Sequence, residues 1–255
     1  MCLLRSERVL RQHLETDRLL GIEVVPVAEE QVTVSGQTPR RAVENQPALS
    51  GDVVDKKHLL DAIDRQEVRS CTQCPLCKSR TQTVFGEGNP DAGLMFVGEG
   101  PGQNEDRQGR PFVGRAGEML NKQIVAMGLT REQVYIANVV KCRPPNNRAP
   151  TPIEAQTCWR YLRRQIDIIR PRVIVTLGGP ATKLLLETTK GITAIRGSWH
   201  RFDQLVPDGP SIPVMPTFHP AYLLRAYTPE NRKKVWSDLQ KAVLCLQEPG
   251  GPDAT

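Results

Sequence analysis

A glycine-rich loop carries the residues whose types could do chemistry on a planar polar ring. It runs over residues 98–117 and has the sequence GEGPGQNEDRQGRPFVGRAG. Its glycines let backbone N–H groups approach a ligand closely. Glu99 and Glu105 supply carboxylates, and Phe112 supplies a flat apolar face. A backbone nest, an acid and an aromatic ring together predict a pocket for such a ring.

Cysteines form a second set of reactive side chains. The chain has seven, which in an intracellular protein favours metal or cluster binding over disulfides. Cys71 and Cys74 form a CxxC pair, and Cys142 and Cys158 form a distant second pair. Four thiolates can hold zinc or an iron–sulfur cluster, and ligand type alone does not choose between them. Cys77 makes another CxxC with Cys74, so spacing leaves the ligand set open.

Four apolar runs have the length of buried strands and would position these loops. They span about 94–97, 134–140, 173–177 and 212–218, with helical patterns between them. The prolines in the last run predict an edge strand. The alternation predicts an α/β fold, a three-layer α/β/α arrangement with a central, mostly parallel four-stranded sheet. Loops that follow the strands should meet at one edge of that sheet, where open α/β proteins bind ligands.

Composition divides the chain into an extension and a folded part. We expect a weakly ordered or partner-binding N-terminal extension over 1–65, one domain over 66–247 and a frayed tail over 248–255. The net charge is +6; residues 1–65 hold nine Lys/Arg against eleven Asp/Glu, which leaves 25 against 17 for the rest. This cationic excess suits a polyanionic partner such as nucleic acid, although a charge for solubility explains it equally well.

The sequence predicts no membrane partner. No run approaches the roughly 18 apolar residues of a membrane span. The N-terminus is rich in charges and lacks the apolar core of a signal peptide. We therefore expect a cytoplasmic protein.

Taken together, the motifs are similar to those of the family 4 uracil-DNA glycosylases, the iron–sulfur type found in many bacteria and archaea. The matches run in the family's order over about residues 70–246, and so many in order are not expected by chance. Residues 1–65 lie outside the resemblance. The matching pieces are 98–102, Glu105-Asp106, 110–117, Asn138, 141–145, Asn147-Arg148 and 219–225.

The resemblance implies a [4Fe-4S] cluster. It places the ligands on Cys71, Cys74, Cys142 and Cys158 and leaves Cys77 spare. In the family the cluster ties the entry segment to the loop and helix after the second strand, so its expected role is structural. The chemistry then needs no open coordination site.

Uracil excision requires the base to leave the stack and to be read by its edge. Phe112 is expected to stack on the flipped base. Asn138 is expected to read it, because an amide can accept from N3–H and donate to O4. His219 is expected to donate to O2, where negative charge develops in the reaction. Backbone N–H groups of the loop glycines would assist, and the pocket glycines are Gly98, Gly100 and Gly102.

Two carboxylates compete for the attacking water. We expect Glu105 to position it, with Glu99 in the pocket wall and Asn147 supporting the same water. Family 4 enzymes lack the aspartate that family 1 enzymes place in the corresponding loop, and Gly100 stands there in this chain. No lysine occupies a nucleophile position in the motifs. The expected reaction is therefore monofunctional and leaves an abasic site.

The expected partner is uracil-containing DNA, bound in the nucleoid by a monomer. Tyr222, Leu223 and Leu224, followed by Arg225, would enter the minor groove and fill the vacated space. Phosphate contacts are expected from Arg148 and Lys141, with further candidates at Arg110, Arg115 and Arg143. Residues 1–65 are a candidate site for a repair or replication protein.

Two alternatives share the same fold. One is a relative that captures uracil-DNA without turnover; the covalent type carries an inserted basic loop with its own His after the second strand. Here that segment is the short 142–148, which contains no His. The other is a cluster-bearing scaffold without activity, which the intact set of pocket residues disfavours. A nucleotide-binding protein is disfavoured because the loop matches neither a Walker A nor a GxGxxG pattern.

Overall fold

The computed structural model describes residues 55–203 and 211–247. Most of the expected extension, residues 1–54, and the expected tail, 248–255, lie outside the described residues. A compact unit begins at Lys56, which is earlier than the boundary expected at residue 66. The reason is helix α2 (Lys56–Ile63), whose Leu60 and Ile63 are buried in the main core.

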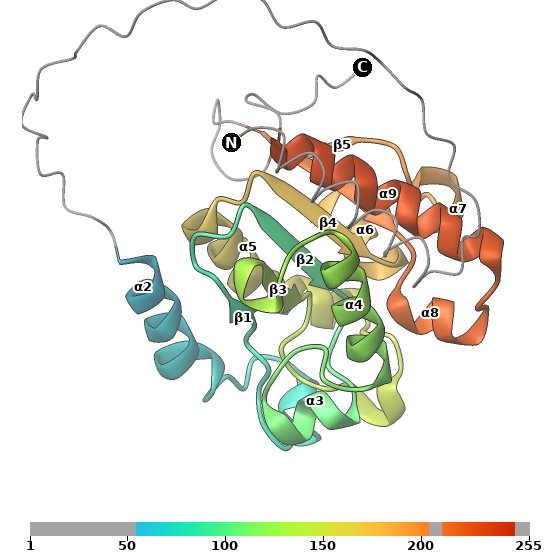
Figure 1. Cartoon of the computed structure of the whole chain (residues 1–255). Coiled ribbons are helices and arrows are strands. Elements are labelled where there is room, and N and C mark those ends of the chain that lie inside the picture. The colour runs from blue at the N-terminus through green and yellow to red at the C-terminus, as the bar shows by residue number, and fades with distance from the viewer. Residues whose placement is uncertain (1–54, 204–210, 248–255) are drawn as a thin grey trace, which may run out of the picture. The chain divides into compact units, whose positions relative to one another are not determined.

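A six-stranded sheet forms the centre of this unit (Figure 1). Its order is β1-β3-β2-β4-β6-β5, and the four inner strands are parallel. They are the four strands that the sequence predicts: β2 (Leu94–Gly98), β3 (Tyr135–Asn138), β4 (Val173–Leu177) and β6 (Ile212–Thr217). The antiparallel edge strands β1 (Glu87–Gly88) and β5 (His200–Phe202) were not predicted. Two or three residues are too few to show a period.

The prediction that the last run is an edge strand is wrong, because β6 lies between β4 and β5. Its two prolines are accommodated by staggered pairing. Pro213 is in register with Arg201 of β5 and precedes the stretch paired with β4, whereas Pro216 is in register with Thr176 of β4 and lies beyond the stretch paired with β5. Each proline therefore sits in a ladder on one side only, where a missing N–H is tolerated.

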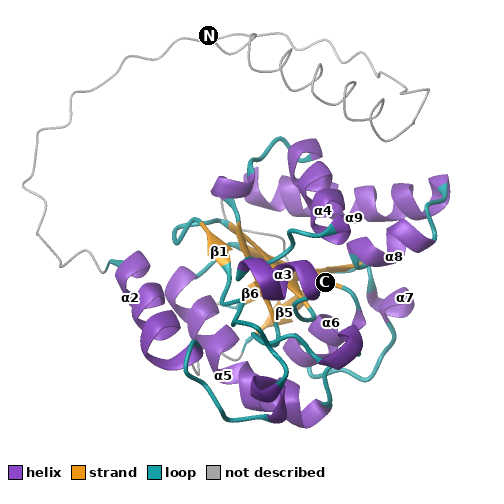
Figure 2. Ribbon diagram, turned by 90° about the horizontal axis from the view of Figure 1, so that it is seen from below, coloured by secondary structure: helices purple, strands orange, loops and turns teal. Residues whose placement is uncertain are grey.

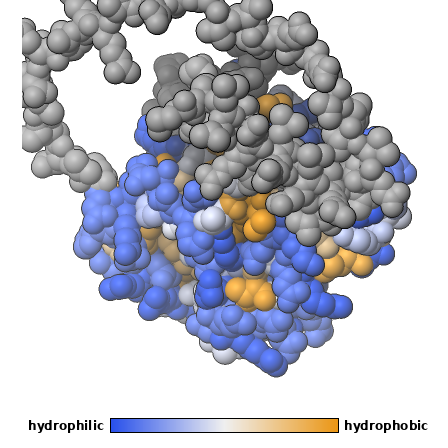
Figure 3. All heavy atoms as spheres, viewed as in Figure 1, coloured by the Kyte–Doolittle hydropathy of each residue, from blue (hydrophilic) through white to orange (hydrophobic). Residues whose placement is uncertain are grey.

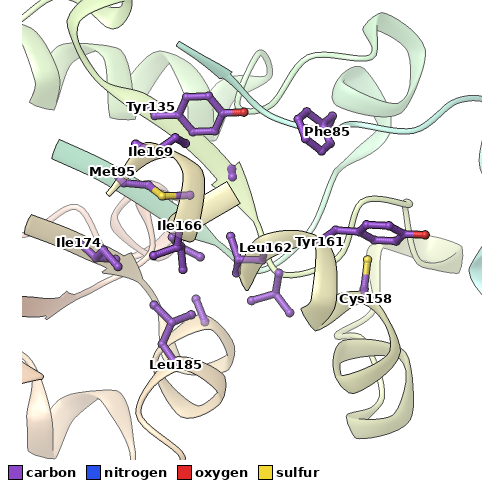
Figure 4. Close-up of a cluster of buried hydrophobic side chains, with 14 of the residues drawn as sticks. Phe85, Met95, Tyr135, Cys158, Tyr161, Leu162, Ile166, Ile169, Ile174 and Leu185 are labelled. Atoms are coloured by element: carbon purple, nitrogen blue, oxygen red, sulfur yellow. The ribbon is translucent and has the colours of Figure 1, made fainter. Parts of the chain in front are cut away.

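Helices cover both faces of the sheet, as predicted (Figure 2). Helices α5 (Pro152–Ile169) and α6 (Gly179–Leu185) lie on one side, and α4 (Arg115–Ala126) and α9 (Pro229–Gln247) lie on the other. Figure 4 shows Met95 and Ile174 of the sheet beside Ile166 of α5 and Leu185 of α6. Burial of these apolar side chains is the main stabilising term of the three-layer arrangement.

Shorter elements occupy the loops. The helices are α3 (Gln103–Gln108), α7 (Ile192–Ile195) and α8 (Pro220–Arg225), and single turns span Asp64–Val68, Pro75–Lys78, Arg131–Gln133 and Pro145–Asn147. Within the described ranges, no helix has both the length and the apolar character needed to cross a membrane. The visible face is mostly hydrophilic, with small separate apolar spots (Figure 3).

Helix α5 begins where the sequence predicts. The Thr151 hydroxyl accepts from the Glu154 N–H, the Glu154 carboxylate accepts from the Thr151 N–H, and Pro152 stands at the first position. Arg148 donates to both carboxylate oxygens of Glu154, at 2.8 and 2.7 Å. These bonds lower the pKa of Glu154 to about 2. The capped helix start thus anchors the loop that follows β3.

Candidate functional site

A cavity of about 750 Å³ lies among the loops that follow the carboxyl ends of β2, β3 and β6. The sequence predicts this location, and the structure brings most of the candidate residues together there. Those that line the cavity are Glu99, Gly100, Gly102, Glu105, Phe112, Asn138, Asn147, Arg148, His219, Leu224 and Arg225. Of the residues predicted to bind the base or DNA, those not in the lining are Gly98, Arg110, Lys141, Arg143, Tyr222 and Leu223.

Gly98 ends β2 beneath the cavity, where two functional side chains meet. A β-carbon at this position would lie 2.4 Å from Oδ1 of Asn138 and 2.5 Å from Cζ of Phe112. Both distances are far inside van der Waals contact. Only glycine therefore lets the asparagine amide and the phenylalanine ring come together over the strand end.

Asn138 is the last residue of β3 and is 1% exposed. Its Oδ1 is buried and finds no hydrogen-bond partner within the described part of the protein. Buried amide oxygens in folded proteins nearly always accept a hydrogen bond. Because Asn138 lines the cavity, this acceptor is suited to an N–H group of a bound ligand.

Phe112 is held in a left-handed backbone conformation, with φ of 51°, which is uncommon outside glycine and asparagine. Glu105 stabilises this turn, because its Oε1 accepts from the N–H groups of Val113 and Gly114 at 2.9 and 2.8 Å. The Phe112 ring centroid lies 5.7 Å from that of His219, with 30° between the rings. The carboxylate predicted to position water thus also shapes the aromatic wall.

Arg131 is a supporting residue that the sequence analysis missed. It donates to the carbonyl oxygens of Pro111 and Phe112, and to Glu87 of β1 at 2.6 Å. Glu87 also accepts from Arg110, at 2.7 Å. No motif surrounds Arg131, so only the tertiary structure reveals that it fixes the Phe112 turn to the edge of the sheet.

His219 precedes α8 and caps it. Its Nδ1 accepts from the Ala221 N–H at 3.0 Å, which assigns the ring proton to Nε2. Burial lowers the pKa of His219 to about 4, and the nearby charge of Arg225 acts in the same direction. At neutral pH the ring is therefore an uncharged imidazole whose remaining polar group is an N–H donor.

Glu99 follows β2 and is half-buried in the cavity wall. Burial raises its pKa. The loop that carries it is joined to the segment after β3, because Val139 N–H donates to the Gly98 carbonyl and Val140 N–H donates to that of Glu99, at 2.9 and 3.2 Å. The two loops therefore form one continuous wall.

Two residues predicted to contact DNA face the interior, and those predictions are wrong. Lys141 is 1% exposed, and its Nζ donates to the Asn138 carbonyl at 2.9 Å and to Gln165 Oε1 at 2.5 Å. Desolvation lowers the pKa of Lys141 to about 8. Leu223 is 2% exposed and packs inward from α8. Neither side chain can reach a phosphate or a groove.

The other candidate DNA contacts differ in how far they are available. Leu224 is 41% exposed and lines the cavity beside the exposed Arg225. The half-buried Tyr222 packs on Phe218, with 4.7 Å between centroids. Arg148 lines the cavity while it pairs with Glu154. Of the further candidates, Arg115 lines the cavity, Arg143 donates to Asn147 Oδ1 at 2.7 Å, and Arg110 pairs with Glu87.

A second, smaller cavity is lined by Cys71, Cys74, Cys77, Cys142 and Cys158. The structure therefore brings the two distant pairs together and places Cys77 beside them. None of these five cysteines forms a disulfide. Across the described ranges, however, no three His, Cys, Asp or Glu side chains are grouped so as to hold a single metal ion.

Hydrogen-bond donors point at the sulfur atoms of this cysteine cavity. Arg80 donates to Sγ of Cys142 at 3.1 Å and to the Cys71 carbonyl at 2.8 Å. The backbone N–H of Lys141 donates to Sγ of Cys158 at 3.3 Å. Burial raises the pKa of the Cys158 thiol to about 11. Loss of that proton thus requires a strong compensating interaction, such as a bond to a metal.

The fold is α/β, and the larger cavity at the carboxyl edge of its sheet is suited to a flat, hydrogen-bonding ring. The family model of the uracil DNA glycosylase superfamily matches residues 85–240. The chain belongs to this superfamily, and within it to the type-4 uracil-DNA glycosylases.

The type-4 uracil-DNA glycosylase of Thermotoga maritima is 47% identical over 196 residues, which cover 76% of this chain and 98% of the relative. That of Sulfurisphaera tokodaii is 48% identical over 189 residues, 71% of this chain and 84% of the relative. A type-5 uracil-DNA glycosylase of Pyrobaculum aerophilum is 31% identical over 156 residues, 49% of this chain and 69% of the relative. The resemblance noted from the motifs is confirmed.

Proposed function

We propose that the protein is a uracil-DNA glycosylase that hydrolyses the N-glycosidic bond of uracil in DNA and leaves an abasic site, which initiates base-excision repair. Membership of the type-4 family supports uracil excision. The main observation in support of base recognition concerns Asn138, which lines the cavity. Its Oδ1 is buried and accepts no hydrogen bond from the described part of the protein.

Asn138 reads the uracil edge. Its Oδ1 accepts from N3–H and its Nδ2 donates to O4, whereas cytosine has an acceptor at N3 and an amino donor at C4. With cytosine, Oδ1 would face the N3 acceptor and Nδ2 would face the amino donor, so both polar groups of the buried amide would lack a partner. The resulting loss of binding free energy is much larger than that of a single missing hydrogen bond. Phe112 packs against the face of the flipped base. The base must leave the duplex, because its reacting bond is shielded there.

His219 stabilises the departing base. As the bond between N1 and C1′ breaks, its electron pair moves onto the uracil ring, and part of that charge reaches O2. The Nε2–H of a neutral imidazole can donate to O2 without first losing or gaining a proton. The Ala221 N–H fixes the tautomer that this role requires.

Water completes the reaction at C1′, where positive charge develops. Glu105 keeps Oε1 on the Phe112 turn, and we assign its other oxygen to the attacking water, which loses a proton to it. Glu99 lines the same cavity and contributes a second carboxylate to the wall. Asn147 supports the water from the loop after β3. Among the described residues, none of those that line the cavity is a lysine, which supports hydrolysis without a Schiff base.

The DNA-binding surface surrounds the cavity mouth. Leu224 is the proposed wedge, with Tyr222 behind it, and Arg225 and Arg148 are the proposed phosphate contacts. We further propose a monomer that acts on nucleoid DNA in the cytoplasm. Residues 1–65 are the proposed contact for a repair or replication protein.

We propose that Cys71, Cys74, Cys142 and Cys158 hold a [4Fe-4S] cluster, with Cys77 spare. The chemistry of the donor set fits, because four thiols from distant segments line one cavity, and Arg80 and a backbone N–H donate to the sulfurs of Cys142 and Cys158. A cubane takes one thiolate on each of four irons, so its ligands need not converge on a single ion. When bound, the group supplies a covalent tie between residues 71–77, the loop after β3 and α5.

A labelled oligonucleotide with one uracil tests the proposed reaction. Purified protein should yield a strand break only after alkali, and oligonucleotides with thymine or cytosine at that position should stay intact. The Asn138→Ala variant is the matched control for a contaminating glycosylase. Cleavage without alkali would contradict the monofunctional reaction. A gel-stable protein–DNA complex without turnover would support the binding-protein alternative, and neither product nor complex from protein that contains iron would support the scaffold.

A further inference from the structure

Lys141 is a buried cation that the proposed reaction leaves unused. Its ammonium donates to two neutral oxygens, the Asn138 carbonyl and Gln165 Oε1, and lies 5.8 Å from the Phe85 ring centroid. Burying an ammonium group costs several kcal/mol unless its surroundings compensate. A methionine of similar length would fill the same space without that cost. What a methionine could not do is donate to the Asn138 carbonyl and to Gln165.

The partner side chain is itself fixed. Gln165 projects from α5 and is fully buried. Its Nε2 donates to the Phe85 carbonyl at 3.0 Å and to the Tyr135 hydroxyl at 3.2 Å. These bonds orient the amide so that Oε1 faces Lys141. The ammonium of Lys141 is therefore held between Gln165 of α5 and the Asn138 carbonyl at the end of β3.

That place is directly behind the residue proposed to read uracil. The carbonyl of Asn138 accepts from Lys141. The next two N–H groups donate to the last residue of β2 and to the residue after it, Val139 to Gly98 and Val140 to Glu99. The backbone of Asn138 is thus held from both sides at the point where β3 ends. Its side chain is buried and lies so close to Gly98 that a β-carbon there would be 2.4 Å from Oδ1.

We propose that Lys141 is a positioning residue for uracil recognition. Its ammonium holds the Asn138 carbonyl and so fixes the placement of the Asn138 amide against the base. Lys141 touches neither base nor DNA. The proposal rests on the proposed function of Asn138 and extends it to a residue that the motif alone suggests is a DNA contact.

Lys141→Met tests the proposal, because it keeps the length of the side chain and removes the donor. We expect kcat for uracil excision to fall about tenfold, the equivalent of one hydrogen bond to a charged group, while KM for DNA stays constant. Thr176→Val is the matched control. It removes a buried hydrogen bond of 2.8 Å between Thr176 of β4 and Thr182 of α6. That variant should lose stability but keep kcat.

A double-mutant cycle with Asn138→Ala separates positioning from general destabilisation. If Lys141 acts through Asn138, the double variant should be as slow as Asn138→Ala alone in single-turnover assays. If the two losses multiply, Lys141 acts independently and the proposal is overturned. Inactive wild-type protein would instead refute the proposed function, whatever Lys141 does.

Gln165→Met provides a second route if Lys141→Met does not fold. It leaves the ammonium in place but removes its orienting partner, so it should give a smaller loss of kcat that again disappears in the Asn138→Ala background. Iron content should stay unchanged in Gln165→Met. Lys141→Met keeps the backbone bond to Cys158 but loses the side-chain charge that lowers the pKa of the Cys158 thiol, so kcat is expressed per molecule of protein that contains iron. Unchanged kcat in both folded variants would also overturn the proposal.

Discussion

The two cavities share the segment that follows β3, but the protein satisfies their polar atoms differently. In the base pocket, Asn138 Oδ1 is left without a donor from the rest of the described structure. In the cysteine cavity, the sulfurs of Cys142 and Cys158 each accept a hydrogen bond from the protein. We propose that the pocket keeps this acceptor for a ligand, and that the donors in the cysteine cavity stabilise thiolates that bind the cluster. We therefore expect substitutions in the cysteine cavity to act mainly on stability, and substitutions in the base pocket to act mainly on activity.

The largest effect is expected at the cysteine cavity. Cys71→Ser should prevent iron incorporation and lower Tm by about 10 °C or more, since about 1 kcal/mol corresponds to about 2–4 °C in a domain of this size. Cys77→Ser should retain the iron and the Tm. Iron analysis, visible absorbance and thermal melts measure both variants. Iron loss in Cys77→Ser with retention in Cys71→Ser would require a different ligand set.

The reverse pattern is expected at His219. His219→Ala should lower kcat by about 10²–10³-fold, as does loss of one donor to a developing oxyanion. The fall in Tm should be only about 2–4 °C, from loss of the α8 cap. Because the pKa of His219 is about 4, its ionisation should not shape kcat between pH 6 and 8. A wild-type step in kcat near pH 6.5 that disappears in the variant would show that the ring titrates in the active range.

Gly98 tests how tightly the pocket is built. Gly98→Ala introduces a β-carbon 2.4 Å from Asn138 Oδ1, and overpacking of this kind costs about 1–3 kcal/mol. We expect uracil excision to fall by about ten- to a hundredfold. Gly179→Ala in α6 is the control, because its β-carbon would have nothing within 4 Å. Equal activity in the two variants would mean that the pocket relaxes around the methyl group.

The smallest effect is expected at the start of α5, between the two cavities. Glu154→Gln should lower the free energy of unfolding by about 1–2 kcal/mol at pH 7, which is the usual loss when a helix cap is removed. The rate of uracil excision should stay nearly unchanged. The folded pKa of Glu154, about 2, lies below its ordinary value of 4.5, so its stabilisation is present above pH 4.5 and lost as pH falls towards 2. Urea unfolding at pH 7 and pH 3 should show the gap between wild type and variant narrowing. A constant gap would contradict the role of the charge.

Much of the pocket could be predicted because its residues follow strand ends. Phe112 and His219 lie on the loops after β2 and β6, Asn138 ends β3, and a parallel sheet brings these strand ends to one edge. The strands themselves show as apolar runs, and the start of α5 shows in its Thr-Pro-x-Glu sequence. Local sequence therefore contains the fold class and the location of the site.

The remainder depends on contacts between distant residues. Lys141 stands among Cys142, Arg143 and two prolines, a context typical of an exposed basic loop, and only Gln165 on another helix reveals that it turns inward. Arg131 acts across the sheet edge and has no local signature. The inner position of β6 depends on β5, which is too short to be recognised from its sequence.

The brevity of the edge strands has a consequence for behaviour at high concentration. An exposed strand edge presents unpaired N–H and C=O groups, on which a strand of another molecule can add. In the part of the chain that the structure describes, the edges are β1, two residues long, and β5, three residues long. Each presents too few backbone groups for a stable intermolecular ladder, so the sheet is protected against growing from one molecule into the next, and association through strand pairing is disfavoured.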